Sequence, residues 1–310
     1  MLSRRNFLVA AFAVPALTSI GAHAQSAWPS KPIRWIVNFP PAGAADILSR
    51  SLADYFGGKL GQPIVVENKP GAGGMVGADI LAKARGDTHL VMMSSAASHG
   101  IGPVLYKEVP YDPLADFTHI HLVGTFPSVL AVNGTSPIKS VKELVEMAKA
   151  KPGEVNYGTG GNGTMNHLTG QLLARAAGMQ FVHVPYRGSA PAMNDLMGGQ
   201  IVALMESLPT AIGYFTSGRM RPLAVSEDQR SSSLPDVPTF REAGFPGVVT
   251  TNWFGFTATA DIPRDLVLRW ESETGTALQS AQVREAFAKI GVRPRRLSAR
   301  RDFQIGRAHV

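Results

Sequence analysis

The sequence predicts an α/β protein with two substantial cores. Short apolar runs rich in β-branched residues alternate with longer stretches of helical periodicity along most of the chain. The order strand, glycine-containing turn and helix occurs twice, at residues 33–56 and 154–177. The 310 residues are 45% hydrophobic and 17% charged, which is typical of a globular protein with room for two domains.

Residues 1–24 have the three parts of an export signal. The basic start MLSRRNFL is followed by an apolar run and by the small-residue site Ala22-His23-Ala24. The apolar run is too short for a stable membrane helix. The pair Arg4-Arg5 within SRRNFL is typical of twin-arginine signals, and a Sec-type signal with a chance arginine pair is the alternative. We expect a soluble periplasmic protein after removal of the signal.

The remaining composition excludes several classes of function. The chain has no cysteine, so a disulfide, thiol chemistry and a cysteine-linked lipid anchor are excluded. Loss of Arg4 and Arg5 lowers the formal charge from +7 to +5. The arginines near the C-terminal end, at residues 293–301, have no interleaved aromatic residues for base stacking, so we expect no nucleic-acid binding.

The expected strands follow in order along the chain, with helices between most of them. The alternation predicts mainly parallel sheets. The helix after the first strand has Leu48, Leu52 and Tyr55 at helical spacing. The strands are expected at residues 33–37, 63–67, 90–94, 129–133, 155–158, 181–184, 201–205 and 223–226.

The turn after the first strand is stiff and narrow. Pro40 and Pro41 fix φ and lack backbone donors, and Gly43 permits a close backbone approach. The turn leads into a helix, and a free helix N-terminus attracts anions. Asp46 lies in the first turn of that helix, where we interpret it as a helix-start carboxylate rather than a catalytic group.

The second glycine turn has the spacing of a dinucleotide fingerprint at Gly158, Gly160 and Gly163. That site needs an acidic residue at the end of the next strand, and residues 181–187 supply none. A second candidate beginning at Gly71 has Val76 in place of its last glycine. We therefore expect no cofactor, and a helix start suited to a carboxylate or phosphate.

Metal and nucleophilic chemistry have little support. His119 and His121 lie on one face of a strand-like segment, but no third ligand accompanies them, so we interpret them as surface histidines and expect no metal. The chain has no Gly-x-Ser-x-Gly elbow. For His167, ligand contact and helix-start bonding remain equally open.

Eight segments along the chain occur together in one order: WPSKPIR, FPPAGAAD, GQPIVVENKPGAGG, YKEVPYDP, NYGTGGNGT, HVPYRGSAP, LPDVPTFREAGFPG and NWFG. With these segments the chain resembles the Bug family, the extracytoplasmic receptors of tripartite tricarboxylate transporters. The resemblance implies an α/β bilobal periplasmic binding protein fold of type II-like form, with a ligand cleft and no catalysis. It implies one lobe of residues 28–126 plus 252–310 and another of 127–251, joined by crossings near 125–128 and 250–254.

The resemblance also implies which residues bind the ligand. They lie in loops that face the cleft from both lobes, and the opening turn would hold one carboxylate directly or through water. Arg187 has the charge to meet a second carboxylate, whereas Tyr186 either contacts the ligand or packs the cleft. The implied set is Phe39, Pro40, Pro41, Ala42, Gly43, Ala44, Asp46, Ser94, Ser95, Ala96, Thr159, Gly160, Gly163, Thr164, His167, Tyr186, Arg187, Gly188 and Glu206.

Several residues depart from the family pattern. Ala42 replaces a usual glycine, Ala44-Ala45 a usual hydroxyl-bearing pair, and the turn at residues 85–90 is shortened. Glu206-Ser207 replaces a common Asp-Asn pair, and Glu206 would favour a ligand ammonium group if it reaches the cleft. Residues 305–310, IGRAHV, back-translate to the start of a common sequencing adapter, so we expect the natural C-terminus to be missing.

The expected function is that of a monomeric periplasmic receptor. It would capture a small carboxylate, either an organic acid or an acidic amino acid, and deliver it to a membrane permease. One alternative is an enzyme on the same scaffold that uses Asp46 and His167 as an acid–base pair. Another is a sensor partner that reports ligand occupancy to a membrane receptor.

Overall fold

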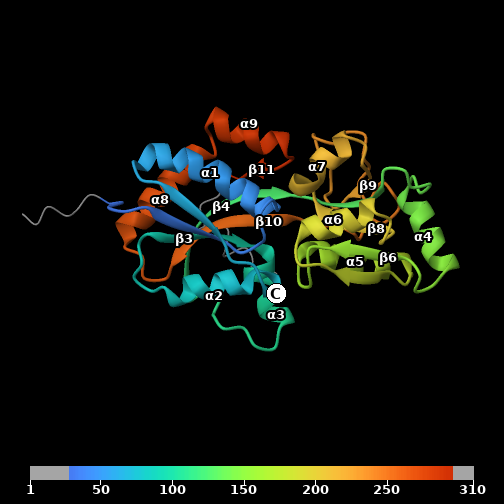
Figure 1. Cartoon of the computed structure of the whole chain (residues 1–310), viewed down its shortest axis with the longest axis horizontal. Coiled ribbons are helices and arrows are strands. Elements are labelled where there is room, and N and C mark those ends of the chain that lie inside the picture. The colour runs from blue at the N-terminus through green and yellow to red at the C-terminus, as the bar shows by residue number, and fades with distance from the viewer. Residues whose placement is uncertain (1–27, 296–310) are drawn as a thin grey trace, which may run out of the picture.

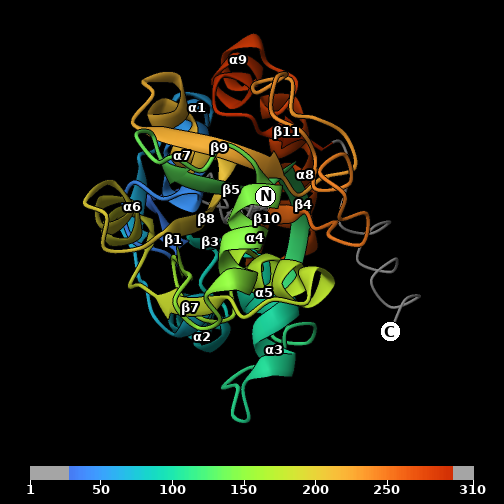
Figure 2. The same cartoon turned by 90° about the vertical axis from the view of Figure 1, so that its right-hand side faces the viewer.

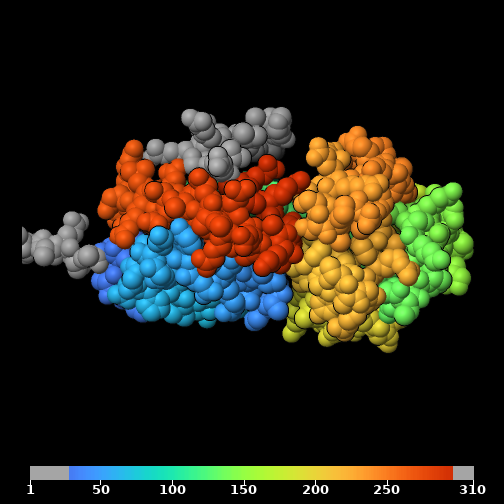
Figure 3. Space-filling view, turned by 90° about the horizontal axis from the view of Figure 1, so that it is seen from above, coloured from blue at the N-terminus to red at the C-terminus, as the bar shows by residue number. Residues whose placement is uncertain are grey.

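The computed structural model describes residues 28–295, which form two α/β lobes side by side (Figure 1). The expectations for residues 1–24 and 305–310 lie outside the described residues. Seen from above, the lobes are separated by a groove (Figure 3). Within residues 28–295, none of the helices combines the length and the apolar character that crossing a membrane requires.

The first lobe is built on a six-stranded sheet with the order β11-β4-β10-β3-β1-β2. Its helices pack on both faces. The elements are β1 (Ile33–Val37), α1 (Ala44–Leu60), β2 (Ile64–Asn68), η1 (Ala72–Gly74), α2 (Met75–Lys83), β3 (Leu90–Ser95), η2 (Ala97–Ile101), α3 (Gly102–Leu105), β4 (Phe117–Phe126), β10 (Asn252–Thr259), α8 (Arg264–Ala277), α9 (Ala281–Lys289) and β11 (Arg293–Pro294).

The second lobe, seen end-on in Figure 2, is built on a five-stranded sheet with the order β7-β6-β8-β5-β9. Alternate residues of β5 enter different cores: Leu130 and Val132 pack on one face, Val129 and Ala131 on the other. The elements are β5 (Ser128–Asn133), α4 (Val141–Ala150), β6 (Asn156–Thr159), α5 (Met165–Ala177), β7 (Val182–Pro185), α6 (Ser189–Met197), β8 (Ala203–Ser207), α7 (Leu208–Thr216) and β9 (Met220–Val225).

An aromatic cluster holds α1 and α8 against the first sheet. The ring centroids of Trp35 of β1 and Phe256 of β10 are 4.9 Å apart. The ring of Phe56 of α1 packs edge-on against Trp270 of α8, with 5.2 Å between the centroids. All four side chains are buried. Helix α1 ends at Leu60 and is capped by Gly61, whose φ of +69° is the left-handed conformation that glycine adopts readily. This packing fixes the direction in which the start of α1 points.

Both sheets are mixed, so the prediction of mainly parallel sheets is wrong. Parallel pairing joins β1 to β2 and β3, and β6 to β7 and β8. Strand β10 runs antiparallel between β3 and β4, and β5 runs antiparallel between β8 and β9. The reason is that β5 and β10 begin where the chain passes from one sheet to the other, so each enters its sheet from the opposite direction.

The strands β4, β10 and β11 were not among the expected ones. The histidines of β4 also differ from the prediction. His121 is buried, and its Nδ1 lies 2.8 Å from the backbone oxygen of Leu122; His119 is half-buried, with Nε2 2.9 Å from the oxygen of Pro113. They are not surface residues, because β4 pairs on both edges, with β10 and β11.

Candidate functional site

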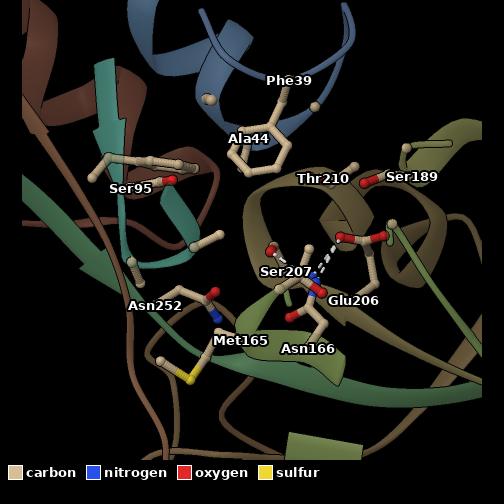
Figure 4. A pocket seen from close by; sticks show the side chains of 18 of the residues that line it. Phe39, Ala44, Ser95, Met165, Asn166, Ser189, Glu206, Ser207, Thr210 and Asn252 are labelled. Atoms are coloured by element: carbon tan, nitrogen blue, oxygen red, sulfur yellow. Dashed lines mark hydrogen bonds between the residues drawn. The ribbon is translucent and has the colours of Figure 1, made fainter. Parts of the chain in front are cut away.

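A cavity of about 70 Å³ lies between the lobes. Figure 4 shows Phe39 and Ala44 on one side and Asn166, Glu206 and Ser207 on the other. The walls come from the turn between β1 and α1, the end of β3, the starts of α5, α6 and α7, and the start of β10. The lining residues are Phe39, Pro40, Pro41, Gly43, Ala44, Ala45, Ser95, Ala96, Ala97, Gly160, Thr164, Met165, Asn166, Gly188, Ser189, Glu206, Ser207, Thr210, Asn252, Trp253 and Phe254.

Three helices begin at the cavity without a side-chain cap. The residues before α1, α6 and α7 are Gly43, Gly188 and Ser207, and none of their side chains caps the helix with a hydrogen bond. In contrast, Ser140 caps α4, away from the cavity, by accepting from Glu143 N at 3.2 Å. The first N–H groups of a helix lack internal partners, so uncapped starts leave donors and positive dipole ends toward the cavity.

The opening turn is held from behind by Asp46. Its Oδ2 accepts a hydrogen bond from Ala42 N at 3.0 Å, and its carboxylate also accepts from Arg50 and Asn68. Burial acts to raise the pKa of Asp46, but these hydrogen bonds outweigh it and hold the pKa below its usual value. Asp46 does not line the cavity. It fixes the turn that Ala42 adopts with a φ of +62°.

The glycine turn of the second lobe is held in a similar way. Thr164 Oγ1 caps α5 by accepting from His167 N at 3.2 Å, and Gly163 N donates to His167 Nδ1 at 3.4 Å. The His167 ring stacks on His183, with 4.1 Å between ring centroids. Burial lowers the pKa of His167, and burial together with His167 lowers that of His183 to about 4. His167 therefore serves the helix start and does not line the cavity.

Glu206 does reach the cavity, from the end of β8. Its side chain is 1% exposed, and its Oε1 accepts hydrogen bonds from Ser207 N at 2.7 Å and Asn166 Nδ2 at 3.3 Å. Burial raises the pKa of Glu206 to about 7, against the opposing effect of these donors. Of the residues that line the cavity, Glu206 alone carries an ionisable side chain, and no cationic side chain lines it.

An outer cleft adjoins the cavity. It lies between the glycine segment of residues 70–74 with Tyr106 on the first lobe and residues 160–162 and 185–188 on the second. Arg187 is exposed there, and the Tyr186 hydroxyl donates to Asp195 Oδ2 at 2.7 Å. Phe39, Pro40, Gly160 and Gly188 border both spaces. Arg187 thus lines the outer cleft and not the cavity.

The structure brings eleven of the residues implied by the sequence to the cavity wall. Asp46, Thr159 and His167 support the loops instead, and Ser94 Oγ accepts a hydrogen bond from Thr257 Oγ1 at 2.7 Å within the sheet. Asp46 and His167 do not meet in the cavity as an acid–base pair. The eleven are Phe39, Pro40, Pro41, Gly43, Ala44, Ser95, Ala96, Gly160, Thr164, Gly188 and Glu206.

Sequence reasoning missed five polar residues of the cavity wall. Asn166, Ser189, Ser207 and Thr210 occupy the first turns of helices or the residue before them, which is the only local signal that could have found them. Asn252 begins the NWFG segment but had no assigned role. Among residues 28–295, no group of three or more His, Asp or Glu side chains is arranged to hold a metal ion.

Known proteins agree with this architecture. The sequence profile of the tripartite tricarboxylate transporter family receptor matches residues 48–307. BugT of Bordetella pertussis is 37% identical over 268 residues, which cover 86% of this chain and 82% of BugT.

Three solved structures are also similar to this chain. A periplasmic transporter is 35% identical with a TM-score of 0.87, covering 91% of this chain and 94% of its own. Rpa4515 of R. palustris with adipate is 30% identical, with a TM-score of 0.88 and the same coverage. MatC of Rhodopseudomonas palustris with bound malate is 28% identical with a TM-score of 0.80, covering 86% and 90%. The chain belongs to the tripartite tricarboxylate transporter receptors of the Bug type, periplasmic solute-binding proteins rather than enzymes.

Proposed function

We propose that this receptor binds a small carboxylate in the cavity between its lobes. The observation that carries the proposal is the convergence of three uncapped helix starts, of α1, α6 and α7, on a cavity without a cationic side chain. Their backbone donors supply what a carboxylate needs. The similar structures that hold adipate and malate support the same class of ligand.

The binding residues fall into three groups under this proposal. The eleven predicted residues on the cavity wall, with Asn166, Ser189, Ser207, Thr210 and Asn252, contact the ligand or its waters. Asp46, Thr159, Gly163 and His167 hold the loops in shape. Arg187 meets ligands or ligand groups that extend into the outer cleft.

We also propose that binding closes the two lobes on the ligand. Residues 28–126 with those from 252 onward would move as one body and residues 127–251 as the other. The hinge would lie at 125–128 and 250–254, where the chain passes between the sheets. Small-angle scattering should show compaction with a ligand confirmed by calorimetry, and no compaction would contradict the closure.

The partner of the closed receptor is a membrane permease of the same transport system. The family membership supports this partner. Export by the twin-arginine route and a monomeric receptor in the periplasm complete the proposal. Replacing Arg4 and Arg5 by lysine should block export by that route, whereas a Sec-type signal would tolerate the change.

A thermal-shift screen of organic acids tests the ligand class directly. A ligand at one hundred times its dissociation constant stabilises the folded protein by about 2.7 kcal/mol. Di- and tricarboxylates and acidic amino acids should raise the melting temperature, and the matching neutral amides should not. A protein that responds to the amides or to sugars and to none of the carboxylates would contradict the proposal.

A further inference from the structure

One carboxylate oxygen in the cavity has no protein partner. Glu206 is buried at the end of β8, where Ser207 N and Asn166 Nδ2 donate to Oε1 and the hydroxyls of Ser189 and Ser207 also favour the charged form of the carboxyl group. Oε2 has no hydrogen-bond partner among the described residues. Buried polar atoms in folded proteins nearly always have a partner, so the free oxygen requires an explanation.

The hydrogen bonds behind Glu206 all run toward it. Asn252 Nδ2 donates to Ser128 Oγ at 2.9 Å, Ser128 Oγ donates to Asn166 Oδ1 at 2.7 Å, and Asn166 Nδ2 donates to Glu206 Oε1. Donors that point at a carboxyl group favour its charged form. Glu206 is therefore prepared as an acceptor at the end of this chain.

No cationic side chain in the cavity wall balances a negative charge on Glu206. The elements packed around it contribute neutral groups: the amide of Asn166 from α5, the hydroxyl of Ser189 from α6, and Ser207 and Thr210 at α7. Val129 of β5 is its neighbour in the sheet. Burial without a cation raises the pKa of Glu206 to about 7. A buried carboxylate is costly unless it is paired or protonated, and a cationic group of the ligand would provide the pair.

A second unpartnered oxygen lies in the first turn of α7, which follows β8 directly. Thr210 is 9% exposed and lines the same cavity, and its Oγ1 has no hydrogen-bond partner among the described residues. Two oxygen acceptors suit an ammonium group, which has three donors and no acceptor. A ligand carboxylate, in contrast, would meet the charge of Glu206.

We propose that the ligand carries a protonated amine as well as its carboxylate, and that this amine donates to Glu206 Oε2 and Thr210 Oγ1. The inference rests on the proposed function, because the helix starts would hold the carboxylate while Glu206 selects the amine. The ligand class is thereby narrowed to amino acids and related amino-carboxylates. The competing possibility is a protonated Glu206 that donates from Oε2 to a second ligand carboxylate, and the two differ in the sign of their pH dependence.

Calorimetry on matched pairs of ligands tests the inference. The pairs are aspartate and succinate, glutamate and glutarate, and alanine and propionate, which differ by the amine. At pH 8 we expect the amine-bearing member of the binding pair to bind at least about tenfold more tightly. Because an ammonium partner needs ionised Glu206, lowering the pH to 6 should weaken its binding by about tenfold.

Two variants distinguish the role of the Glu206 side chain in ligand selection from general effects on folding. Glu206→Gln should remove the preference for the amine. Glu227→Gln, which alters a buried glutamate paired with Arg293 outside the cavity, should keep it. Circular dichroism checks that both variants fold.

Three results would overturn the inference. One is a plain acid that binds as tightly as its amine-bearing partner. Another is binding that tightens from pH 8 to pH 6 and survives in Glu206→Gln, which identifies Glu206 as a proton donor to the ligand. If no member of any pair and no other carboxylate binds, the proposed function fails and the inference fails with it; if plain acids bind as tightly as their amine-bearing partners, the inference fails and the proposed function stands.

Discussion

Gly188 and Pro40 meet across the cleft, so closely that a Cβ atom on Gly188 would lie 2.8 Å from Cγ of the Pro40 ring. The contact joins the turn after β1 of the first lobe to the start of α6 in the second. Both residues border the cavity and the outer cleft. The contact therefore lies between the cavity and the outer cleft.

Gly188→Ala should weaken ligand binding by at least about tenfold, because the added methyl group prevents the lobes from approaching this closely. Gly188 also has a φ of +109°, which strains any other residue. Gly161→Ala is the matched control, since Gly161 has a φ of +139° but its Cβ would meet only Tyr186 O at 3.4 Å. Adding Pro40→Ala to Gly188→Ala should restore part of the affinity measured by calorimetry. Unchanged binding by Gly188→Ala would show that this contact does not govern closure.

Asp46→Ala should lower the free energy of unfolding by roughly 1–3 kcal/mol and change ligand affinity little. The reason is that the Asp46 carboxylate holds Ala42, Arg50 and Asn68 and does not line the cavity. The pKa of Asp46 is lowered in the folded protein, so its stabilisation is present above its ordinary pKa and is lost as the pH falls through the folded value. Urea unfolding of this variant and of exposed Asp54→Ala on the same helix measures the difference. A large loss of affinity with intact stability would place Asp46 at the ligand.

Gly43→Val should reduce affinity by about a hundredfold, because its branched side chain would cover the N–H groups at the start of α1 and cost the ligand two charge-assisted hydrogen bonds. The backbone tolerates a side chain here, since φ is −82° and a Cβ would lie 3.4 Å from Pro40 O. Gly43→Ala should consequently lower the ligand affinity only a few fold. Calorimetry measures the affinity of both variants and of the parent protein. If Gly43→Val binds the ligand as tightly as the parent, this helix start does not bind it.

Glu206→Gln should stabilise the ligand-free protein more at pH 8 than at pH 5, by on the order of 1–3 kcal/mol. The folded pKa of about 7 lies above the ordinary value of 4.5, so the folded protein holds this proton more tightly than the unfolded chain. Stability of the parent protein therefore falls as the pH rises from about 4.5 to 7, and glutamine removes that loss. Urea unfolding at both pH values tests the sign. If the variant and the parent differ in free energy of unfolding by the same amount at pH 5 and pH 8, ionisation of Glu206 does not destabilise the folded protein.

Arg187→Ala should weaken binding of a ligand that extends into the outer cleft by less than about tenfold, with a greater effect at low salt. Arg187 is exposed, and exposed charge pairs contribute little and are screened. Calorimetry with succinate and adipate at two salt concentrations measures the effect. Complete loss of binding would indicate a side-chain ion pair as the main source of affinity.

Much of the fold could be predicted from local pattern. The first strand begins and ends at the expected residues, and the other expected strands lie within three residues of the observed ones. Strand β10 was not predicted, because its insertion between β3 and β4 depends on pairing with residues that are far away in the sequence. Residues 118–122 of β4 were expected to be strand-like, but the burial of His121 was not predicted, because it depends on the pairing of β4 with β10 and β11.

The sequence by itself determined the two turns and the helices that follow them, because prolines, glycines and apolar spacing act within a few residues. Only the tertiary structure decided which groups face the cavity. Asp46 turns toward Ala42 and Asn68, whereas Glu206 enters the cavity at the end of a chain of hydrogen bonds from Asn252. Asn252 and Ser128 are 124 residues apart in the sequence. The direction of a side chain in such a network depends on where distant strands bring its partners, and local periodicity carries no information about that.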